Sequence, residues 1–125
     1  MAIQASGEDY LETILELEDQ NGLVRSVEIA RKLGVSRPSV NKAMNILKEA
    51  GMIYHESYGD ISLTDKGRER ANETIKRHRI LKTFLIDILK IDEITADEDA
   101  CKMEHVISDV TIAKWESFIE AYLNK

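Results

Sequence analysis

Three side chains that could bind a metal ion stand close together in the second half of the sequence: Cys101, Glu104 and His105. If the stretch from Ala100 to about Asp109 is helical, they share one face, because residues three and four apart are neighbours on a helix. A thiolate, a carboxylate and an imidazole are ligands that proteins offer to divalent metal ions. Such a triple also occurs by chance on surface helices. Whether it is a metal site therefore depends on which other donors the chain can bring to it.

Three other residues could add donors to such a site. Asp9 and Glu12 stand three apart near the start of the first predicted helix, where acidic residues also interact favourably with the helix terminus. His78 lies beside the apolar stripe of the longest predicted helix, although a histidine among basic residues is ordinarily a surface or packing residue. Our hypothesis is that these three residues converge with the first three on one metal centre.

The composition excludes several classes of protein. The chain has 125 residues, of which 43% are hydrophobic and 32% charged, as is typical of a globular protein. No apolar run approaches the roughly 20 residues of a membrane span, and the N-terminus lacks the features of a secretory signal. A single cysteine excludes a disulfide within the chain. We therefore expect a cytoplasmic protein with no membrane partner.

The charges are distributed unevenly along a chain whose net charge is −6. Residues 8–19 contain six acidic and no basic side chains, and residues 92–109 contain seven acidic and one basic. Between them, residues 22–48 contain six basic and one acidic side chain. This asymmetry indicates a nucleic-acid-binding part and a separate cation-binding part, with solvated helix faces as the simpler alternative.

Residues 26–33 and 36–51 predict two helices joined by a tight turn at Gly34. Ser26 and Ser36 are the expected N-caps. The second of these helices leaves outside the polar and basic side chains that suit base edges and phosphates, namely Arg37, Ser39, Asn41, Lys42 and Asn45. This pattern is typical of a DNA-binding helix-turn-helix, and an ordinary solvated helix is the alternative.

Two strand-like segments, residues 52–58 and 61–64, flank a turn at Gly59 and predict a β-hairpin. A hairpin directly after a helix-turn-helix is the wing of a winged helix. Its tip, near Tyr58, would lie along the phosphate backbone of the DNA.

The longest helix is expected from an N-cap at Thr64 to about Lys90. An acidic connection over residues 92–99 and a last helix over residues 111–123 come after it. The apolar stripes predict the following buried positions: Leu11, Ile14 and Leu15; Val27, Ile29, Ala30 and Leu33; Val40, Met44 and Leu47; and Ala71, Ile75, Leu81, Leu85, Ile88 and Leu89.

The predicted fold is mostly α with a small β-hairpin. Residues 1–70 are expected to form a winged helix-turn-helix DNA-binding domain, and residues 71–125 a helical metal-binding and dimerisation domain. At about 1.5 Å per residue, the long helix exceeds what a small winged domain can cover, so it has to continue into the second domain.

Several stretches together resemble the DtxR/MntR family of bacterial metal-dependent transcriptional repressors. They are Glu8-Asp-Tyr-Leu-Glu12, the helix-turn-helix with its wing, Leu63-Thr-Asp-Lys-Gly67, Arg77-His78 and Ala100-Cys-Lys-Met-Glu-His-Val-Ile-Ser108. The resemblance spans nearly the whole chain and is to the two-domain form without the C-terminal SH3-like domain. It implies that a winged-helix domain leads into a helical dimerisation domain and that metal binds between the two.

The resemblance also implies roles for single residues. The ligands of manganese-sensing members match Asp9, Glu12, His78, Glu104 and His105. A further glutamate of those members falls at Cys101, where iron-sensing members also have cysteine, although they carry methionine in place of Asp9. The second metal site of iron-sensing members is not matched, since its glutamate falls at Lys82 and its histidine near Asp97.

Ligand chemistry and the resemblance favour Fe²⁺ or Mn²⁺ as the cofactor. The carboxylates are hard donors that suit both ions, whereas the Cys101 thiolate is soft and shifts the preference away from Mn²⁺. Zn²⁺, Co²⁺ or Ni²⁺ are expected to substitute in vitro. One or two ions could fit the six donors.

We therefore expect a metal-dependent repressor that binds double-stranded operator DNA as a homodimer and controls metal-ion homeostasis genes, with no small organic ligand. Carboxylates brought together repel one another, and a divalent cation cancels this repulsion. The first helix would then be clamped to the dimerisation domain, with two recognition helices held about 34 Å apart.

Two other classes of function remain as alternatives. The first is a metal-independent winged-helix regulator that responds to an organic effector, or to oxidation of Cys101, although the chain has no second cysteine to resolve an oxidised thiol. The second is an enzyme using a cysteine and histidine pair. We do not expect an enzyme, because no oxyanion-loop or glycine-rich cofactor motif accompanies that pair.

Overall fold

The computed structural model describes residues 7–56 and 59–124 and divides the chain into two compact units. The N-terminal unit comprises residues 1–72 and the C-terminal unit residues 73–125. The division into functional domains at residues 70 and 71 stays a prediction, because compactness does not assign a function to either unit. Among the described residues, no helix is both long and apolar enough to cross a membrane.

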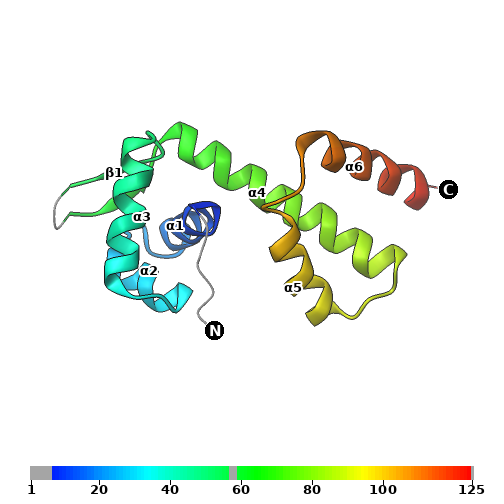
Figure 1. The fold of residues 1–125 in the computed structure, drawn as a ribbon, viewed down its shortest axis with the longest axis horizontal. Helices are drawn as coiled ribbons and strands as arrows, with labels where there is room; N and C mark the ends of the chain where they lie inside the picture. The colour runs from blue at the N-terminus through cyan, green and yellow to red at the C-terminus, as the bar shows by residue number, and fades with distance from the viewer. Residues whose placement is uncertain (1–6, 57–58, 125) are drawn as a thin grey trace. The chain divides into compact units, whose positions relative to one another are not determined.

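The N-terminal unit begins with three helices (Figure 1). They are α1 (Gly7–Asn21), α2 (Ser26–Leu33) and α3 (Arg37–Glu49). The short α2 and the following α3 form the predicted helix-turn-helix, and α1 packs against both. This arrangement gives the basic outer face of α3 a rigid support.

Strands β1 (Ile53–His55) and β2 (Ile61–Leu63) form the predicted antiparallel hairpin after α3. The N–H of Ile61 also donates to the carbonyl oxygen of Val24 at 2.8 Å, which ties the hairpin to the segment before α2. The hairpin confirms the winged-helix prediction. Tyr58, which was predicted at its tip, lies outside the described residues.

One apolar core holds the N-terminal unit together. Its largest fully buried apolar side chains are Leu11, Ile14, Val24, Ile29, Val40, Met44 and Ile61. The buried positions predicted for the first and third helices are confirmed. The prediction for Val27 was wrong: its side chain is 41% exposed, because the short α2 buries only Ile29 and Ala30.

The helix starts show one correct and one wrong prediction. Ser36 caps α3 as predicted, since its Oγ accepts a hydrogen bond from the N–H of Ser39 at 3.2 Å. The predicted cap at Ser26 was wrong, because Ser26 is already the first residue of α2 and Arg25 is the N-cap. There the N–H of Arg25 donates to Oε1 of Glu28 at 3.2 Å, so a glutamate closes the turn.

Helix α4 (Asp65–Thr83) begins in the N-terminal unit and continues into the C-terminal unit, as its predicted length required. Thr64 caps it, because its Oγ1 accepts from the N–H of Gly67 at 3.1 Å. The backbone at Gly67 approaches so closely that an added Cβ would lie 1.9 Å from the carbonyl oxygen of Met52. The start of α4 is therefore packed against the segment that joins α3 to β1.

This close approach makes the substitution Gly67→Ala destabilising. We expect a loss of about 1–3 kcal/mol in the free energy of unfolding, because the added methyl group cannot fit without a backbone shift. Urea unfolding followed by circular dichroism measures it, with Glu69→Ala, an exposed position on the same helix, as the control. Equal midpoints for the two variants would show that the close approach is absent in solution.

The C-terminal unit contains the rest of α4, the π-helical turn η1 (Phe84–Ile88), α5 (Glu93–Met103) and α6 (Asp109–Leu123) (Figure 1). Its main cluster of buried apolar side chains is small and consists, among the described residues, of Leu81, Leu85, Ala96 and Ala100. Phe84 and Trp115 pack against it, with their rings edge to face and centroids 4.9 Å apart.

Two predicted core positions on the long helix were wrong. Ile75 is 36% exposed, because the neighbouring Thr74 takes the buried position. Leu89 is 52% exposed, because the π-helical turn adds a residue and rotates the next part of the chain. The predicted end of the long helix near Lys90 is confirmed. Lys90 has a left-handed φ of 58°, and a right-handed helix cannot continue through such a residue.

Residues 92–99 were predicted as a connection, and this was also wrong. Helix α5 starts at Glu93, with the side chain of Asp92 accepting a hydrogen bond from the N–H of Thr95 at 2.9 Å. The buried face of this helix consists of small alanines, so it shows no large apolar stripe in the sequence. The helix predicted to about Asp109 also ends earlier, at Met103, and α6 starts at Asp109 rather than at residue 111.

Candidate metal centre

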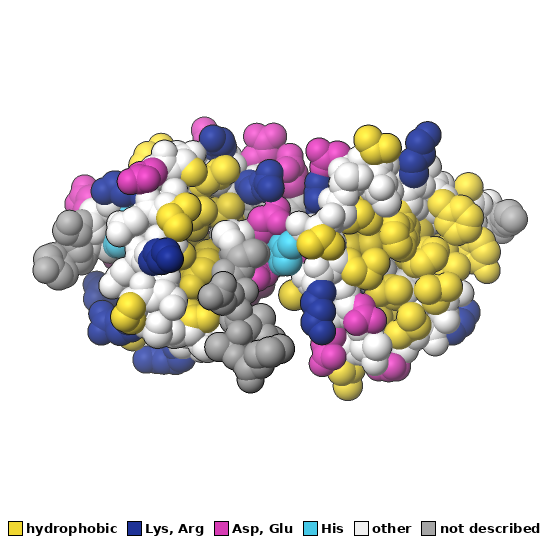
Figure 2. Space-filling model, viewed as in Figure 1, with side chains coloured by type: hydrophobic (Ala, Val, Ile, Leu, Met, Phe, Trp, Pro, Cys, Tyr) yellow, Lys and Arg dark blue, Asp and Glu magenta, His cyan; other side chains and the backbone are white. Residues whose placement is uncertain are grey.

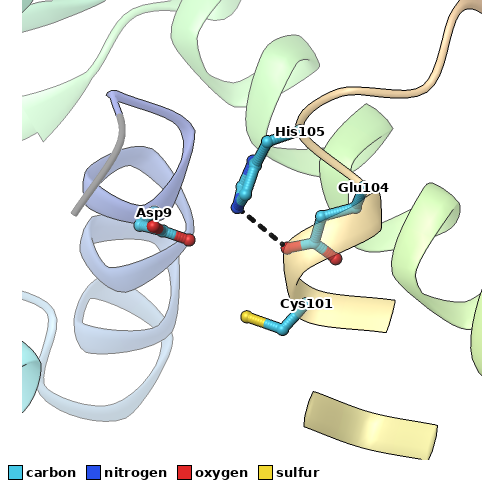
Figure 3. A group of neighbouring side chains, drawn as sticks. All are labelled: Asp9, Cys101, Glu104 and His105. Atoms are coloured by element: carbon cyan, nitrogen blue, oxygen red, sulfur yellow. Dashed lines mark ion pairs between the residues drawn. The ribbon is translucent and has the colours of Figure 1, made fainter. Parts of the chain in front are cut away.

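Cys101, Glu104 and His105 lie together where α5 ends (Figure 3). The Sγ of Cys101, a carboxylate oxygen of Glu104 and a ring nitrogen of His105 lie within 4.8 Å of one another. Cys101 belongs to α5, Glu104 is its C-cap, and His105 lies in the turn before α6. The backbone of Glu104 keeps a right-handed helical conformation just after the helix ends. The structure thus brings these three side chains together.

Glu104 is the buried member of the group, with 1% of its surface exposed. Its Oε1 lies 3.4 Å from Nε2 of His105, and its Oε2 lies 2.8 Å from Nδ1 of His78. A buried carboxylate without partners would be strongly destabilising, so these contacts account for its position.

Arg77 braces the turn that carries Glu104 and His105. Its guanidinium donates to the carbonyl oxygen of Glu104 at 3.4 Å and to that of Ile107 at 2.9 Å, and it pairs with the carboxylate of Asp109. The last carbonyl groups of a helix have no partner within the helix, and a cation favours that end. Arg77 therefore connects α4 to the backbone of the candidate site.

His78 lies between two carboxylates of its own unit. Nδ1 is 2.8 Å from Glu104, and Nε2 is 2.9 Å from Oδ1 of Asp97. The hydrogen bond to Glu104, opposed by burial and supported by the bond to Asp97, raises the pKa of His78 to about 9. At neutral pH, the metal-free protein therefore carries a positive His78 that bridges the two carboxylates.

In the metal-free protein, we expect the His78 ring to lose its proton near pH 9 rather than near 6.5. Because folding raises this pKa, the stabilisation from the bridge is complete below pH 6.5 and is lost as the pH rises through about 9. NMR titration of the ring protons measures the midpoint. Asp97→Asn should lower it, and a wild-type midpoint at or below 6.5 would contradict the bridge.

Asp97 is a site residue that the sequence analysis did not propose as a partner of His78. Its carboxylate also lies 3.3 Å from Nζ of Lys82, which is 3.7 Å from Glu93. Hydrogen bonds from His78 and Lys82 lower the pKa of Asp97. The spacing of four residues between Asp97 and Cys101 was visible in the sequence. It indicates a shared helix face only if residues 92–99 are helical, and they were predicted as a connection.

Asp9 and Glu12 belong to the N-terminal unit, whereas the three neighbouring donors belong to the C-terminal unit. Both carboxylates lie on α1, three residues apart and partly buried, and Figure 3 draws Asp9 as well. Their neighbours Tyr10 and Leu11 face the core of that unit. The spacing therefore puts the two carboxylates on one face of α1, beside its buried face.

The donors of the C-terminal unit fit a divalent transition-metal ion. A thiolate and an imidazole suit Fe²⁺, Co²⁺ and Zn²⁺, and the carboxylate adds a hard donor that Mn²⁺ also accepts. Structural and catalytic zinc takes about four ligands and Mn²⁺ about six. A metal ion bound by Cys101, Glu104 and His105 would therefore need further ligands.

The predicted DNA-contacting residues are exposed along α3, wherever the structure describes them. They are Arg37, Ser39, Asn41, Lys42 and Asn45. The Ser39 hydroxyl lies 2.8 Å from the Ser36 hydroxyl, so it is already engaged in the helix cap. Ile46, which the sequence analysis did not consider for this face, is also 58% exposed on α3.

Two family models match almost the whole chain. Residues 3–61 match the iron-dependent repressor N-terminal DNA-binding domain, and residues 64–123 match the iron-dependent repressor metal-binding and dimerisation domain. The chain belongs to the iron-dependent repressor family. This confirms the family resemblance and the predicted fold of a winged helix-turn-helix followed by a helical dimerisation domain.

Individual relatives agree with this result. A helix-turn-helix transcriptional regulator of Methanocaldococcus jannaschii is 36% identical over 119 residues, covering 94% of this chain and 95% of that one. The transcriptional regulator MntR of Escherichia coli is 34% identical over 115 residues, covering 92% and 74%. The structure of the manganese regulator SloR has a TM-score of 0.83 and 28% identity, over 94% of this chain and 55% of that one. The chain thus spans about half the length of that solved structure.

Membership of this family decides the class of function. Both matched domains are those of a metal-dependent DNA-binding repressor, so the chain is a transcriptional repressor of this kind and not an enzyme. The alternative of a metal-independent regulator with an organic or redox effector finds no support in these matches.

Proposed function

We propose that the chain is a metal-activated homodimeric repressor of metal-ion homeostasis genes that binds its metal through Cys101, Glu104 and His105. The observation that carries this proposal is the meeting of the three donors within 4.8 Å of one another. They lie in the part of the chain that matches a metal-binding and dimerisation domain. The partner is double-stranded operator DNA, which places the protein in the cytoplasm.

We further propose Asp9, Glu12 and His78 as ligands or close partners of the same site. Asp9 and Glu12 share one face of α1, and His78 reaches Glu104 directly through Nδ1. The ligand types of the C-terminal unit leave coordination positions to be filled. Ligands drawn from both units would make the position of the DNA-binding unit depend on the metal.

Fe²⁺ is the metal that this ligand set favours most, with Mn²⁺ next. The Cys101 thiolate favours Fe²⁺ over Mn²⁺, whereas the carboxylates accept both. Mn²⁺ is supported by the fold shared with SloR, which is described as a manganese regulator. Zn²⁺, Co²⁺ and Ni²⁺ should bind the same donors in vitro, because imidazole and thiolate ligands also suit these ions, and affinity for such sites rises from Mn²⁺ through Fe²⁺ and Co²⁺ to Ni²⁺.

The switch arises from the charges of the proposed ligands. Asp9, Glu12 and Glu104 repel one another when they are brought together. A bound divalent cation supplies the positive charge that offsets this repulsion. Asp9 and Glu12 would then hold α1, and with it α3, because both helices share one core. Metal and DNA binding would be coupled reciprocally, typically by about 1–3 kcal/mol.

DNA reading is assigned to the exposed face of α3. Arg37 and Asn41 stand in its N-terminal half, the part of a recognition helix that reaches base edges. Arginine suits guanine and asparagine suits adenine, while Ser39, Lys42 and Asn45 can contact bases or phosphates. Ile46 could contact a thymine methyl group. Tyr58, at the predicted tip of the wing, keeps its proposed role in contacting the DNA backbone.

A homodimer is supported by apolar side chains that the C-terminal unit leaves exposed (Figure 2). On α6, Phe118 and Tyr122 are 53% and 45% exposed, and their rings stack with centroids 6.1 Å apart. Phe118 also meets Phe84 edge to face at 6.3 Å. Exposed apolar patches of this kind commonly mark interfaces, and a second copy would cover this one.

Anaerobic titration of metal-free protein with Fe²⁺ or Mn²⁺ should tighten its binding to promoter DNA by about 5–150-fold. The double variant Cys101→Ala and His105→Ala should lose this response, because it removes two of the three neighbouring donors. Fluorescence anisotropy of labelled DNA measures the affinity. Glu98→Ala, an exposed acidic residue on α5, is the matched control and should respond like the wild type.

An unchanged metal response in the double variant would show that the ligand assignment is wrong. If wild-type protein bound DNA equally well with and without every metal tested, the proposed switch itself would be refuted.

Substitutions on α3 test the assignment of the DNA-reading face. Asn41→Ala should weaken binding to the specific operator by about 1–3 kcal/mol and relax the preference for one base, because it removes a base-edge contact. Arg37→Ala should weaken binding at least as much as Arg31→Ala, which removes the same charge from the exposed end of α2. Equal base preferences for Asn41→Ala and the wild type would exclude Asn41 from base reading.

A further inference from the structure

Lys82 stands in the middle of a second group of metal-ligand types in the C-terminal unit. Its Nζ lies 3.3 Å from Oδ1 of Asp97 and 3.7 Å from Oε1 of Glu93. The same Oδ1 of Asp97 lies 2.9 Å from Nε2 of His78. Carboxylates and an imidazole are side chains that commonly ligate metal ions. Here an ammonium group makes contact with both carboxylates.

The resemblance to iron-sensing members did not extend to their second metal site, because the glutamate of that site falls at Lys82. The structure shows why this chain does not fit that site. A lysine ammonium donates hydrogen bonds and accepts none, so it cannot ligate a cation while it is protonated. It would also repel a divalent ion held by Asp97 and Glu93.

We infer that Lys82 is a built-in cation that takes the place of a metal ion, so that the cluster of Lys82, Glu93 and Asp97 binds no metal. Any ion that the wild type binds then belongs to the proposed metal centre around Cys101, Glu104 and His105. The role of Lys82 itself rests only on the contacts around its ammonium group.

The inference also defines what His78 can offer to the proposed centre. Its Nε2 is engaged with Asp97, whose other contact is Lys82, and its Nδ1 faces Glu104. A histidine that donates one N–H to a carboxylate is held in a fixed orientation with its other nitrogen directed at the metal. Asp97 and Lys82 therefore act as positioning residues, and His78 can approach a metal only through Nδ1.

Native mass spectrometry with Zn²⁺ and Mn²⁺ tests this inference by counting ions per subunit. We expect Lys82→Glu, which turns the ammonium into a third carboxylate, to bind one more ion than the wild type. Lys76→Glu makes the same charge change on α4, where Lys76 pairs with Glu116 at 3.7 Å, and should leave the count at the wild-type value. Adding Asp97→Asn to Lys82→Glu should return the count to the wild-type value.

Circular dichroism of each metal-free variant shows that it is folded, and the count for folded protein then decides. An equal count for Lys82→Glu and Lys76→Glu would overturn the inference. Failure of the proposed centre looks different. The wild type and Lys76→Glu would then bind no ion, while Lys82→Glu would still bind one more than either.

Discussion

The Glu104 carboxylate is almost completely buried, and a buried anion is tolerated only where partners replace the lost hydration. His78 and His105 lie 2.8 and 3.4 Å from its two oxygens, and Arg77 holds its backbone carbonyl. These contacts join α4 to the end of α5 in a unit whose main cluster of buried apolar side chains is small. Polar contacts around one carboxylate therefore add to this apolar packing, and they hold the donors in place.

The N-terminal unit is organised differently, by a continuous apolar core with one polar junction at its edge. Oε1 of Glu18 on α1 accepts from the N–H of Leu63 in β2 at 2.9 Å, and its Oε2 pairs with Arg68 of α4 at 2.7 Å. The helix that carries Asp9 and Glu12 is thereby connected to the wing and to the start of α4. If a metal ion restrained α1, the DNA-binding surface on α3 would be restrained with it, because both helices belong to one packed unit. This suits a switch whose proposed ligands include residues of α1.

Most of the fold could be predicted from the sequence, because apolar spacing and turn residues are local signals. The helix-turn-helix, the hairpin and the passage of α4 between units were predictable from such signals. The errors have local causes as well. Helix α5 buries alanines and shows no apolar stripe, Arg25 rather than Ser26 precedes α2, and a π-helical turn rotates Leu89 outward. None of these features changes hydrophobic periodicity enough to be visible in the sequence.

The sequence by itself determined the family, the order of the two parts and the triple of donors, because each depends on residue types at short spacings. Only the tertiary structure decided which partners meet around His78. Asp97 and Glu104 are separated from it by 19 and 26 residues, and only the packing of α5 on α4 brings their carboxylates to its two ring nitrogens. The sequence showed that Lys82 departs from the family pattern. The structure showed that its ammonium lies beside the carboxylates of Asp97 and Glu93.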